Sequence, residues 1–165
     1  MHARAMAGGV LAVMVGGTAF VLWPSEASRV RARVTAAAEA LSGRAGEGDI
    51  DRLARLAGFA KGLAPDVVIE VEPGGSSVRG REAVAAVASQ FAAAGGSQRI
   101  TLSDVAVAFN DNRSRATVTA VAHVTSATTP GPASARDGDV VRIELVKAGD
   151  QWLIARAAPE AALAR

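Results

Sequence analysis

The sequence has no cysteine and no tyrosine, and its other aromatic residues are only four Phe and two Trp. The lack of cysteine excludes disulfide bonds, thiolate nucleophiles and cysteine-ligated metal sites. Proteins that bind single-stranded nucleic acids usually combine a basic surface with aromatic side chains that stack on the bases. The chain has no basic stretch with interleaved aromatics, so we expect no nucleic-acid partner.

Neither sign of charge is in large excess, because the formal net charge is only +2. The isoelectric point near 9.9 overstates the basic character, since without Tyr and Cys few groups titrate between neutral pH and that value. The 165 residues are enough for one domain. Apolar residues make up 50% of the chain, but alanine supplies much of this share, so large core-forming side chains are limited.

A long uncharged run extends from Ala5 to Trp23. As a helix at ~1.5 Å per residue it would span roughly 28 Å, close to the ~30 Å hydrocarbon core of a bilayer. Trp23 suits the membrane interface, and Pro24 would end the helix. We therefore expect residues 1–27 to be a single-pass membrane anchor or an uncleaved signal segment, with a cleaved signal peptide as the alternative. The short basic start favours export, which predicts an extracytoplasmic domain in residues 28–165. The alternative is a cytoplasmic domain, because Arg29, Arg31 and Arg33 follow the run and positive charge favours the cytoplasmic side.

Apolar residues recur at helical spacing in three later segments, which predicts helices over residues 28–42, 49–61 and 81–94. The stripe of the second helix that should face the core consists of Ile50, Leu53, Leu56 and Ala60. The corresponding stripe of the third helix consists of Val84, Val87 and Phe91.

Runs rich in Val, Ile and Thr, separated by turn residues, predict an antiparallel meander in the second half of the chain. Its four strands should cover residues 99–110, 115–126, 139–147 and 151–157. A shorter strand over residues 67–72 should be opened by Asp66. In the first long strand the apolar alternation changes phase near Ser103 and Asp104, which predicts a β-bulge.

Period-two geometry places side chains on the two faces of these strands. Trp152, Ile154 and Arg156 should share one face of the last strand. We expect this face to be internal, in which case the indole N–H of Trp152 needs a hydrogen-bond partner. In the preceding strand the apolar set Val141, Ile143 and Leu145 should also be internal.

Four short motifs resemble the nuclear transport factor 2-like superfamily, in its SnoaL-like branch. They are Gly48-Asp49 before a leucine stripe, APDVVI at residues 64–69, VRGREAV at residues 78–84, and GDQWLIA at residues 149–155. The resemblance covers about residues 28–158, and it rests on the order and spacing of the motifs together.

The resemblance implies an α+β cone, in which a curved antiparallel β-sheet packs on three helices and leaves a pocket at the open end. In the full chain one transmembrane helix would precede this cone. Enzymes of the family use a pocket carboxylate with acid donors that usually include Tyr, or a His with Asp and Tyr. This chain has no Tyr and only two His, so it departs from both catalytic patterns.

Six residues are the candidates for the lining or rim of such a pocket: Asp66, Phe91, Asp104, His123, Trp152 and Arg156. For most of them a structural role is the more common alternative. Asp66 and Asp104 stand at strand ends or turns, where Asp commonly accepts from backbone N–H groups. His123 has no orienting partner nearby in sequence, and Arg156 would also suit the end of the sheet. No spacing of metal ligands and no phosphate loop is present, so we expect neither a metal nor a cofactor.

The first function hypothesis is a membrane-anchored, non-catalytic module for ligand binding or protein assembly, with a small apolar ligand and a homodimer through the outer sheet face. The alternative is a lyase, isomerase or hydrolase acting on a small molecule in the cone pocket. A buried pocket with two polar groups in contact would favour the enzyme, whereas a wholly apolar cavity would favour the module.

Overall fold

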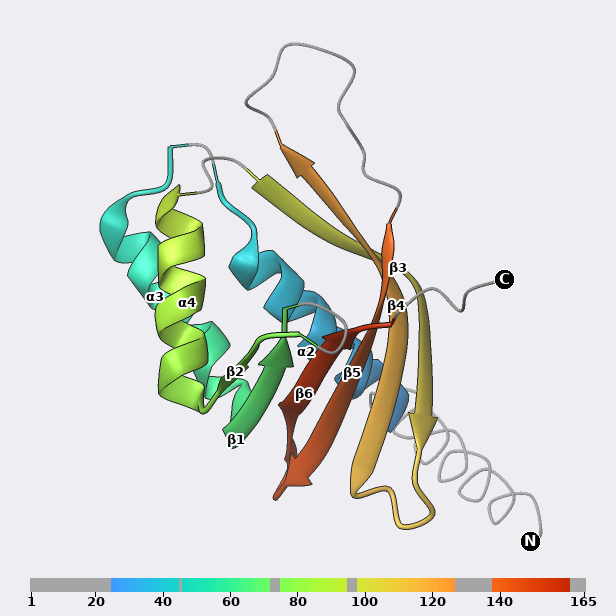
Figure 1. The fold of residues 1–165 in the computed structure, drawn as a ribbon. Coiled ribbons are helices and arrows are strands. Elements are labelled where there is room, and N and C mark those ends of the chain that lie inside the picture. The colour runs from blue at the N-terminus through green and yellow to red at the C-terminus, as the bar shows by residue number, and fades with distance from the viewer. Residues whose placement is uncertain (1–24, 45, 72–74, 95–97, 127–137, 161–165) are drawn as a thin grey trace, which may run out of the picture.

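The computed structural model describes residues 25–44, 46–71, 75–94, 98–126 and 138–160. These residues form two layers, with the helices on one face of a curved sheet (Figure 1). The helices are α2 (Glu26–Leu41), α3 (Asp49–Lys61) and α4 (Arg81–Ala94). The strands are β1 (Leu63–Glu70), β2 (Ser77–Arg79), β3 (Gln98–Phe109), β4 (Arg115–Ser126), β5 (Asp139–Ala148) and β6 (Gln151–Pro159).

The predicted α+β cone is therefore confirmed in its main features. The predicted anchor from Ala5 to Trp23 lies outside the described residues. Within them, no helix is both long enough and apolar enough to cross a bilayer.

The sheet has the order β2-β1-β6-β5-β4-β3, and strands β3 to β6 form the predicted antiparallel meander. The expectation of a wholly antiparallel sheet is wrong, because β1 pairs with β6 in parallel. A connection through β2, α4 and the three strands β3, β4 and β5 separates β1 from β6 in the chain, and long connections of this kind allow parallel pairing. The short strand β2 pairs antiparallel with β1, and it was not predicted from the sequence.

Strand β1 begins at Leu63, earlier than the predicted start after Asp66. Leu63 is buried and pairs with Ile154, and the Ile154 N–H donates to the Gly62 carbonyl at 2.9 Å. Pro65 follows in a stretch where the register shifts between Leu63 and Val68. Proline has no N–H to donate to the hydrogen bonds between strands, and this irregular stretch accommodates it. In the sequence, Pro65 therefore indicates a strand boundary, although the strand begins before it.

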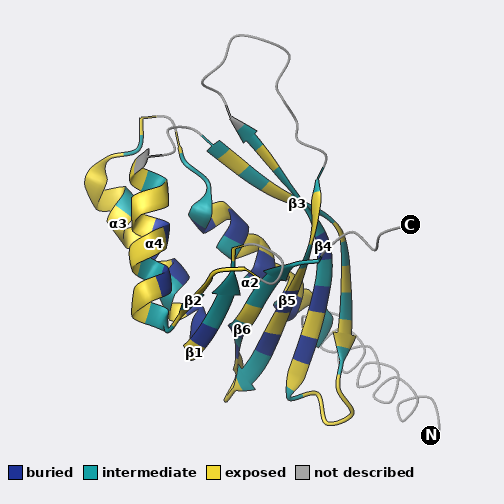
Figure 2. Ribbon diagram, in the orientation of Figure 1, coloured by how far each residue is buried: buried dark blue, intermediate teal, exposed yellow. Residues whose placement is uncertain are grey.

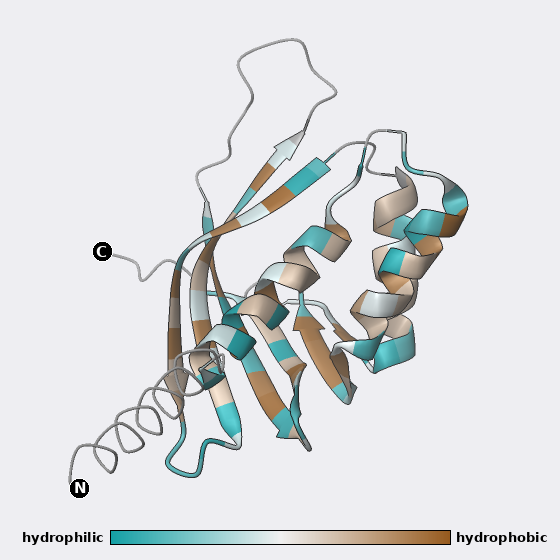
Figure 3. Ribbon diagram, turned by 180° about the vertical axis from the view of Figure 1, so that it is seen from behind, coloured by the Kyte–Doolittle hydropathy of each residue, from teal (hydrophilic) through white to brown (hydrophobic). Residues whose placement is uncertain are grey.

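The core lies between the sheet and α2, and the buried residues gather there (Figure 2). Seen from behind, α2 crosses the inner face of the sheet, next to hydrophobic stretches of the strands (Figure 3). The most deeply buried large side chains are Val30, Val34, Leu63, Val67, Val118 and Leu145. Ile143 and Leu145 are buried and Val141 packs against them, so the predicted inner face of β5 is confirmed.

The predicted core stripe of α3 is wrong in its first half. Leu56 is buried, but Ile50 is 83% and Leu53 65% exposed. Helix α3 packs beside α2 and α4 and has little contact with the sheet, so only its C-terminal half reaches the core (Figure 2). The stripe of α4 behaves similarly, because Val84 is buried and Val87 and Phe91 are half exposed.

Two bulges bend the long strands. The predicted bulge in β3 is confirmed, because the register with β4 shifts between Ser103 and Ala106 and Asp104 has a φ of 52°. The second bulge was not predicted. It lies in β6, where Leu145 pairs with Ile154 but Glu144 pairs with Arg156. This extra residue reverses the alternation, so the prediction that Arg156 shares the inner face with Trp152 is wrong.

Candidate ligand pocket

A cavity of about 360 Å³ lies between the helices and the inner face of the sheet. Its lining consists of aliphatic side chains and two phenylalanines: Val34, Ala37, Ala38, Leu41, Phe59, Leu63, Ile69, Val84, Val87, Ala88, Phe91, Ile100, Leu102, Ile143, Ile154 and Ala157. A cavity of this size is at the small end of those that hold small molecules. We call it the apolar cavity.

Helices α2 and α4 supply two walls of the apolar cavity. On α4, Val84 and Ala88 point into the core, and Val87 and Phe91 extend the same lining with 47% and 43% of their surface exposed. These spacings of three and four residues put the side chains on one face of the helix. Helical turns of α2 supply a second group in the same way: Val34, Ala37, Ala38 and Leu41.

The sheet supplies the third wall through residues that alternate along the strands. Ile100 and Leu102 of β3 line the cavity before the bulge, and Ile143 does so from β5. In β6, Ile154 and Ala157 both line it, although an odd spacing of three would place them on opposite faces of a regular strand. The bulge in β6 is what brings Ala157 to the inside.

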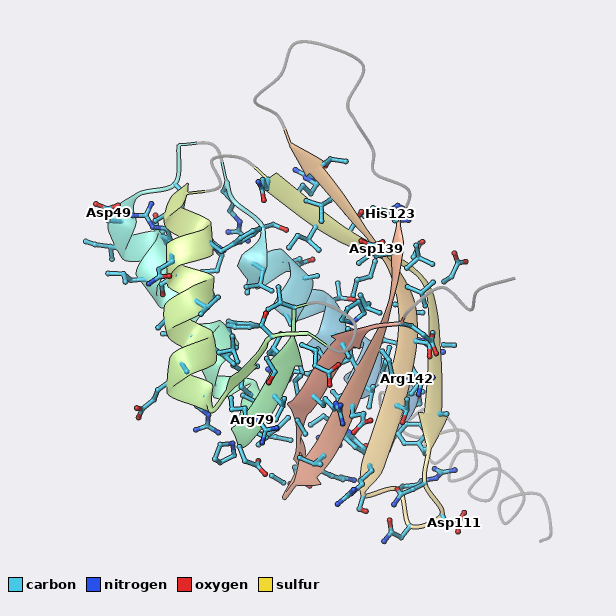
Figure 4. The ribbon with its side chains drawn as sticks, in the orientation of Figure 1. Asp49, Arg79, Asp111, His123, Asp139 and Arg142 are labelled. Carbon is cyan, nitrogen blue, oxygen red and sulfur yellow. The ribbon has the colours of Figure 1, made fainter. Side chains whose placement is uncertain are left out.

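Of the six candidate residues, Phe91 lines the apolar cavity, and the structure places the other five elsewhere. Asp66 is exposed on β1, and Asp104 is exposed in the β3 bulge. His123 and Arg142, both labelled in Figure 4, lie on the face of the sheet that is turned away from the helices. On that face, the Ser103 hydroxyl is 3.1 Å from Nε2 of His123. The six candidates are therefore not brought together.

Trp152 is buried, with 3% of its surface exposed, as expected for an internal residue. Its ring packs against Phe109 with centroids 5.7 Å apart. Its indole N–H donates to Oε2 of Glu26 at 2.7 Å, which supplies the partner that the sequence required. Trp152 thus joins β6 to the first turn of α2, and it is not part of the apolar cavity.

Glu26 is the polar centre of this contact. Its Oε1 also accepts from Nζ of Lys147 at 2.8 Å and from Nη1 of Arg29 at 3.4 Å. The hydrogen bonds from Lys147 and then Trp152 hold the pKa of Glu26 below its ordinary value of 4.5. The role of Glu26 cannot be predicted from the sequence, because Lys147 and Trp152 are more than a hundred residues away in the chain.

Arg156 lies on the outer face of the sheet. Its guanidinium pairs with Glu70 of β1, and this hydrogen bond raises the pKa of Arg156 above its ordinary range. Arg142 and Glu160 form a second ion pair at 2.5 Å on the same face. This face is therefore charged as well as apolar.

Comparison with known proteins agrees with the fold. A family model described as a SnoaL-like domain matches residues 50–158. No curated protein gives a significant match. Among solved structures, Rv3472 from Mycobacterium tuberculosis, whose function is unknown, superposes with a TM-score of 0.64 at 21% identity, covering 80% of this chain and 73% of that one.

Two structures from Streptomyces are similar. ActVI-ORFA from Streptomyces coelicolor has a TM-score of 0.61 at 17% identity, and the match covers 81% of this chain and 94% of that chain. A Streptomyces avermitilis protein of the nuclear transport factor 2-like family has a TM-score of 0.60 at 20% identity, with 83% of this chain and 97% of that chain covered. These likenesses establish the fold, and the family model covers most of the cone. The chain belongs to the family of SnoaL-like domains.

Proposed function

We propose that this domain is a non-catalytic binding module that takes up a small apolar ligand in the apolar cavity. The observation that carries the proposal is the lining itself, which consists of Ala, Val, Leu, Ile and Phe side chains. Burial of apolar surface contributes roughly 25 cal/mol per Å², so a ligand without strong polar groups gains most from such a site.

Acid–base catalysis needs a titratable side chain within hydrogen-bond reach of the substrate. The carboxylates and the histidine that could serve lie outside the cavity: Asp66 and Asp104 are exposed, and His123 is on the outer face. This arrangement supports binding over the alternative of a lyase, isomerase or hydrolase.

The test compares two neighbouring alanines on opposite faces of β6. Ala157 lines the cavity, whereas Ala158 lies on the outer face near Arg142 and Arg156. Replacing Ala157 by Leu fills space that about two ligand methylenes would occupy, at ~0.8 kcal/mol each. Titration calorimetry with 1-octanol should show about tenfold weaker binding for Ala157→Leu and an unchanged affinity for Ala158→Leu. Equal affinities for both variants, or no binding of octanol to the wild type, would contradict the proposal.

We also propose that the uncharged run from Ala5 to Trp23 anchors the domain in a membrane, with the domain on the extracytoplasmic side. The length of the run and the Trp–Pro pair at its end support this. Full-length protein should sediment with membranes and require detergent, while a chain starting at Ser28 should stay in the supernatant. Recovery of uncleaved full-length protein in the soluble fraction would contradict the proposed membrane anchor.

A further inference from the structure

A second cavity, of about 300 Å³, opens between α2 and α3 and has a different chemical character. Its floor is made of residues with little or no side chain: Ala36, Ala40, Gly58 and Gly62. Three arginines and one carboxylate surround it: Arg33, Arg44, Arg55 and Glu39. We call it the arginine cavity.

One of the three arginines is fully engaged. Arg55 donates from Nε and Nη2 to the two carboxylate oxygens of Glu47, at 2.8 and 2.6 Å, and from Nη1 to the carbonyl of Ala40. The Glu47 hydrogen bond raises the pKa of Arg55, and the pKa of Glu47 is lowered in return. Arg55 is therefore a fixed wall of the cavity.

Arg33 and Arg44 differ from Arg55. In the part of the chain that the structure describes, the ion pairs do not include either of them. Arg33 lies beside the C-terminal end of α3, where a Cβ on Gly62 would be 2.9 Å from its Nη1. The helix dipole favours a cation at that end, and Gly62 leaves the guanidinium room to lie there.

The two cavities are neighbours. Ala37, Phe59 and Ile154 line both of them, so a single layer of side chains separates the apolar space from the arginines. The ring of Phe59 is the largest part of this layer. A ligand that occupies both cavities would have to pass this layer.

We infer that the ligand of this domain is amphipathic, with an apolar body in the apolar cavity and one carboxylate that reaches Arg33 and Arg44 beside the Phe59 ring. This inference rests on the proposed function, because it adds an anionic group to the ligand of the same apolar cavity. Arginine suits this task, because its planar fork of donors matches a carboxylate. Arg44 is exposed, so the contact would be open to solvent and salt should weaken it.

The experiment uses titration calorimetry with two probes that have the same number of carbon atoms, octanoate and 1-octanol. For the wild type, octanoate should bind about tenfold more tightly than octanol, and this preference should shrink at high salt. Arg33→Gln and Arg44→Gln should each weaken octanoate binding about tenfold and leave octanol binding unchanged. Arg31→Gln is the matched control, because Arg31 is exposed on the same helix and outside both cavities. It should change neither affinity.

Gly62→Ala tests the position of the guanidinium without a change in charge. The added Cβ would lie 2.9 Å from the flexible end of Arg33, which must move, and 3.2 Å from the Phe59 carbonyl oxygen. Octanoate should therefore bind more weakly to this variant while octanol does not.

The outcomes separate the two proposals. In one outcome, Ala157→Leu weakens octanol binding, but Arg33→Gln and Arg44→Gln leave octanoate binding unchanged. This result would support the apolar site and contradict the anionic one. If Ala157→Leu leaves the affinity for octanoate unchanged, octanoate does not use the apolar cavity. This result would contradict a single ligand for both cavities, even if the arginine variants weaken octanoate binding. Absence of binding for both probes overturns both proposals.

Discussion

Trp152 is the residue on which the contact between the last strand and the first helix depends. It is buried, packs against Phe109 and donates to Glu26. Trp152→Ala should lower the free energy of unfolding by about 3–5 kcal/mol, the usual cost of removing a large buried aromatic side chain. Urea denaturation followed by circular dichroism measures this loss.

Trp152→Phe is the control, because it keeps most of the ring packing and removes the indole N–H. Its loss should be smaller and close to that of one hydrogen bond to a charged group, about 1.5–3 kcal/mol. A loss below about 1 kcal/mol for Trp152→Ala would mean that the side chain is not buried.

Glu26 should make stability depend on pH. Its pKa in the folded protein is lowered, first by the hydrogen bond from Lys147 and then by that from Trp152. A group whose pKa is lower in the folded state stabilises the protein above its ordinary pKa, and this contribution disappears as the pH falls through the folded value. Wild type should therefore exceed Glu26→Gln in stability at neutral pH, and the difference should shrink below the ordinary value of 4.5.

Denaturation at a series of pH values measures this difference. Glu47, whose pKa is also lowered, is present in both proteins, so its contribution cancels. A difference between the two proteins that stays constant into acid would show that Glu26 is not responsible.

At the scale of elements, Ser42 joins the end of α2 to the edge strand β3. Its hydroxyl donates to the Ala38 carbonyl at 2.9 Å and accepts from the Ile100 N–H at 2.9 Å. The neighbouring Gly43 N–H donates to the Gln98 carbonyl at 2.7 Å. Part of the open edge of the sheet is thus occupied, which natural proteins do to avoid pairing with other chains.

Ser42→Ala should leave the Ile100 N–H without its partner and destabilise the fold by about 1–3 kcal/mol. Hydrogen exchange at Ile100 should become faster, while exchange within β4 should change only through global stability. Ser89→Ala is the matched control, because the exposed Ser89 hydroxyl donates to the Ala85 carbonyl within α4. Similar losses for the two variants would argue against a special role for Ser42.

The two bulges show how much of an element can be predicted. The β3 bulge changes the apolar phase of a strand whose residues differ clearly in polarity, so the sequence predicts it. The β6 bulge falls among small residues on either side of Arg156. Alanine fits either face of a sheet, so the alternation of β6 carries little information there, and the side on which Arg156 lies could not be read from it.

At the scale of the molecule, the outer face of the sheet is the surface for the predicted homodimer. Its apolar and threonine side chains are Thr117, Thr119, Val121, Val140, Val146 and Leu153. The ion pairs Arg156–Glu70 and Arg142–Glu160 lie on the same face, and Arg142 stands between Val140 and Val146 on β5. Such a mixed patch suits a weak two-fold contact between copies.

We expect residues 28–165 to dimerise at tens of micromolar, because a ~1 μM affinity, about −8 kcal/mol, is more than a small, partly polar patch should provide. Leu153→Glu should give a folded monomer. Ile50→Glu, on the exposed side of α3, should leave the dimer intact. If light scattering shows a monomer at every concentration, the prediction of a dimer is wrong.

The sequence by itself determined the helices, the meander, the inner face of β5, and the need of Trp152 for a partner. These features follow from periodicity and turn residues, which are local properties of the chain. The SnoaL-like family followed from short motifs of the same local kind. Phe91 shares the predicted helical stripe with Val84, and both line the apolar cavity.

Only the tertiary structure decided the parallel pairing of β1 with β6, the side of Arg156 and the identity of Glu26 as the partner of Trp152. It also decided the composition of both cavities, to which three helices and several strands contribute. Strand register and helix placement depend on contacts between residues far apart in the chain. For that reason the apolar lining around Ala157 and the arginines behind Phe59 become visible only when the sheet and helices are assembled.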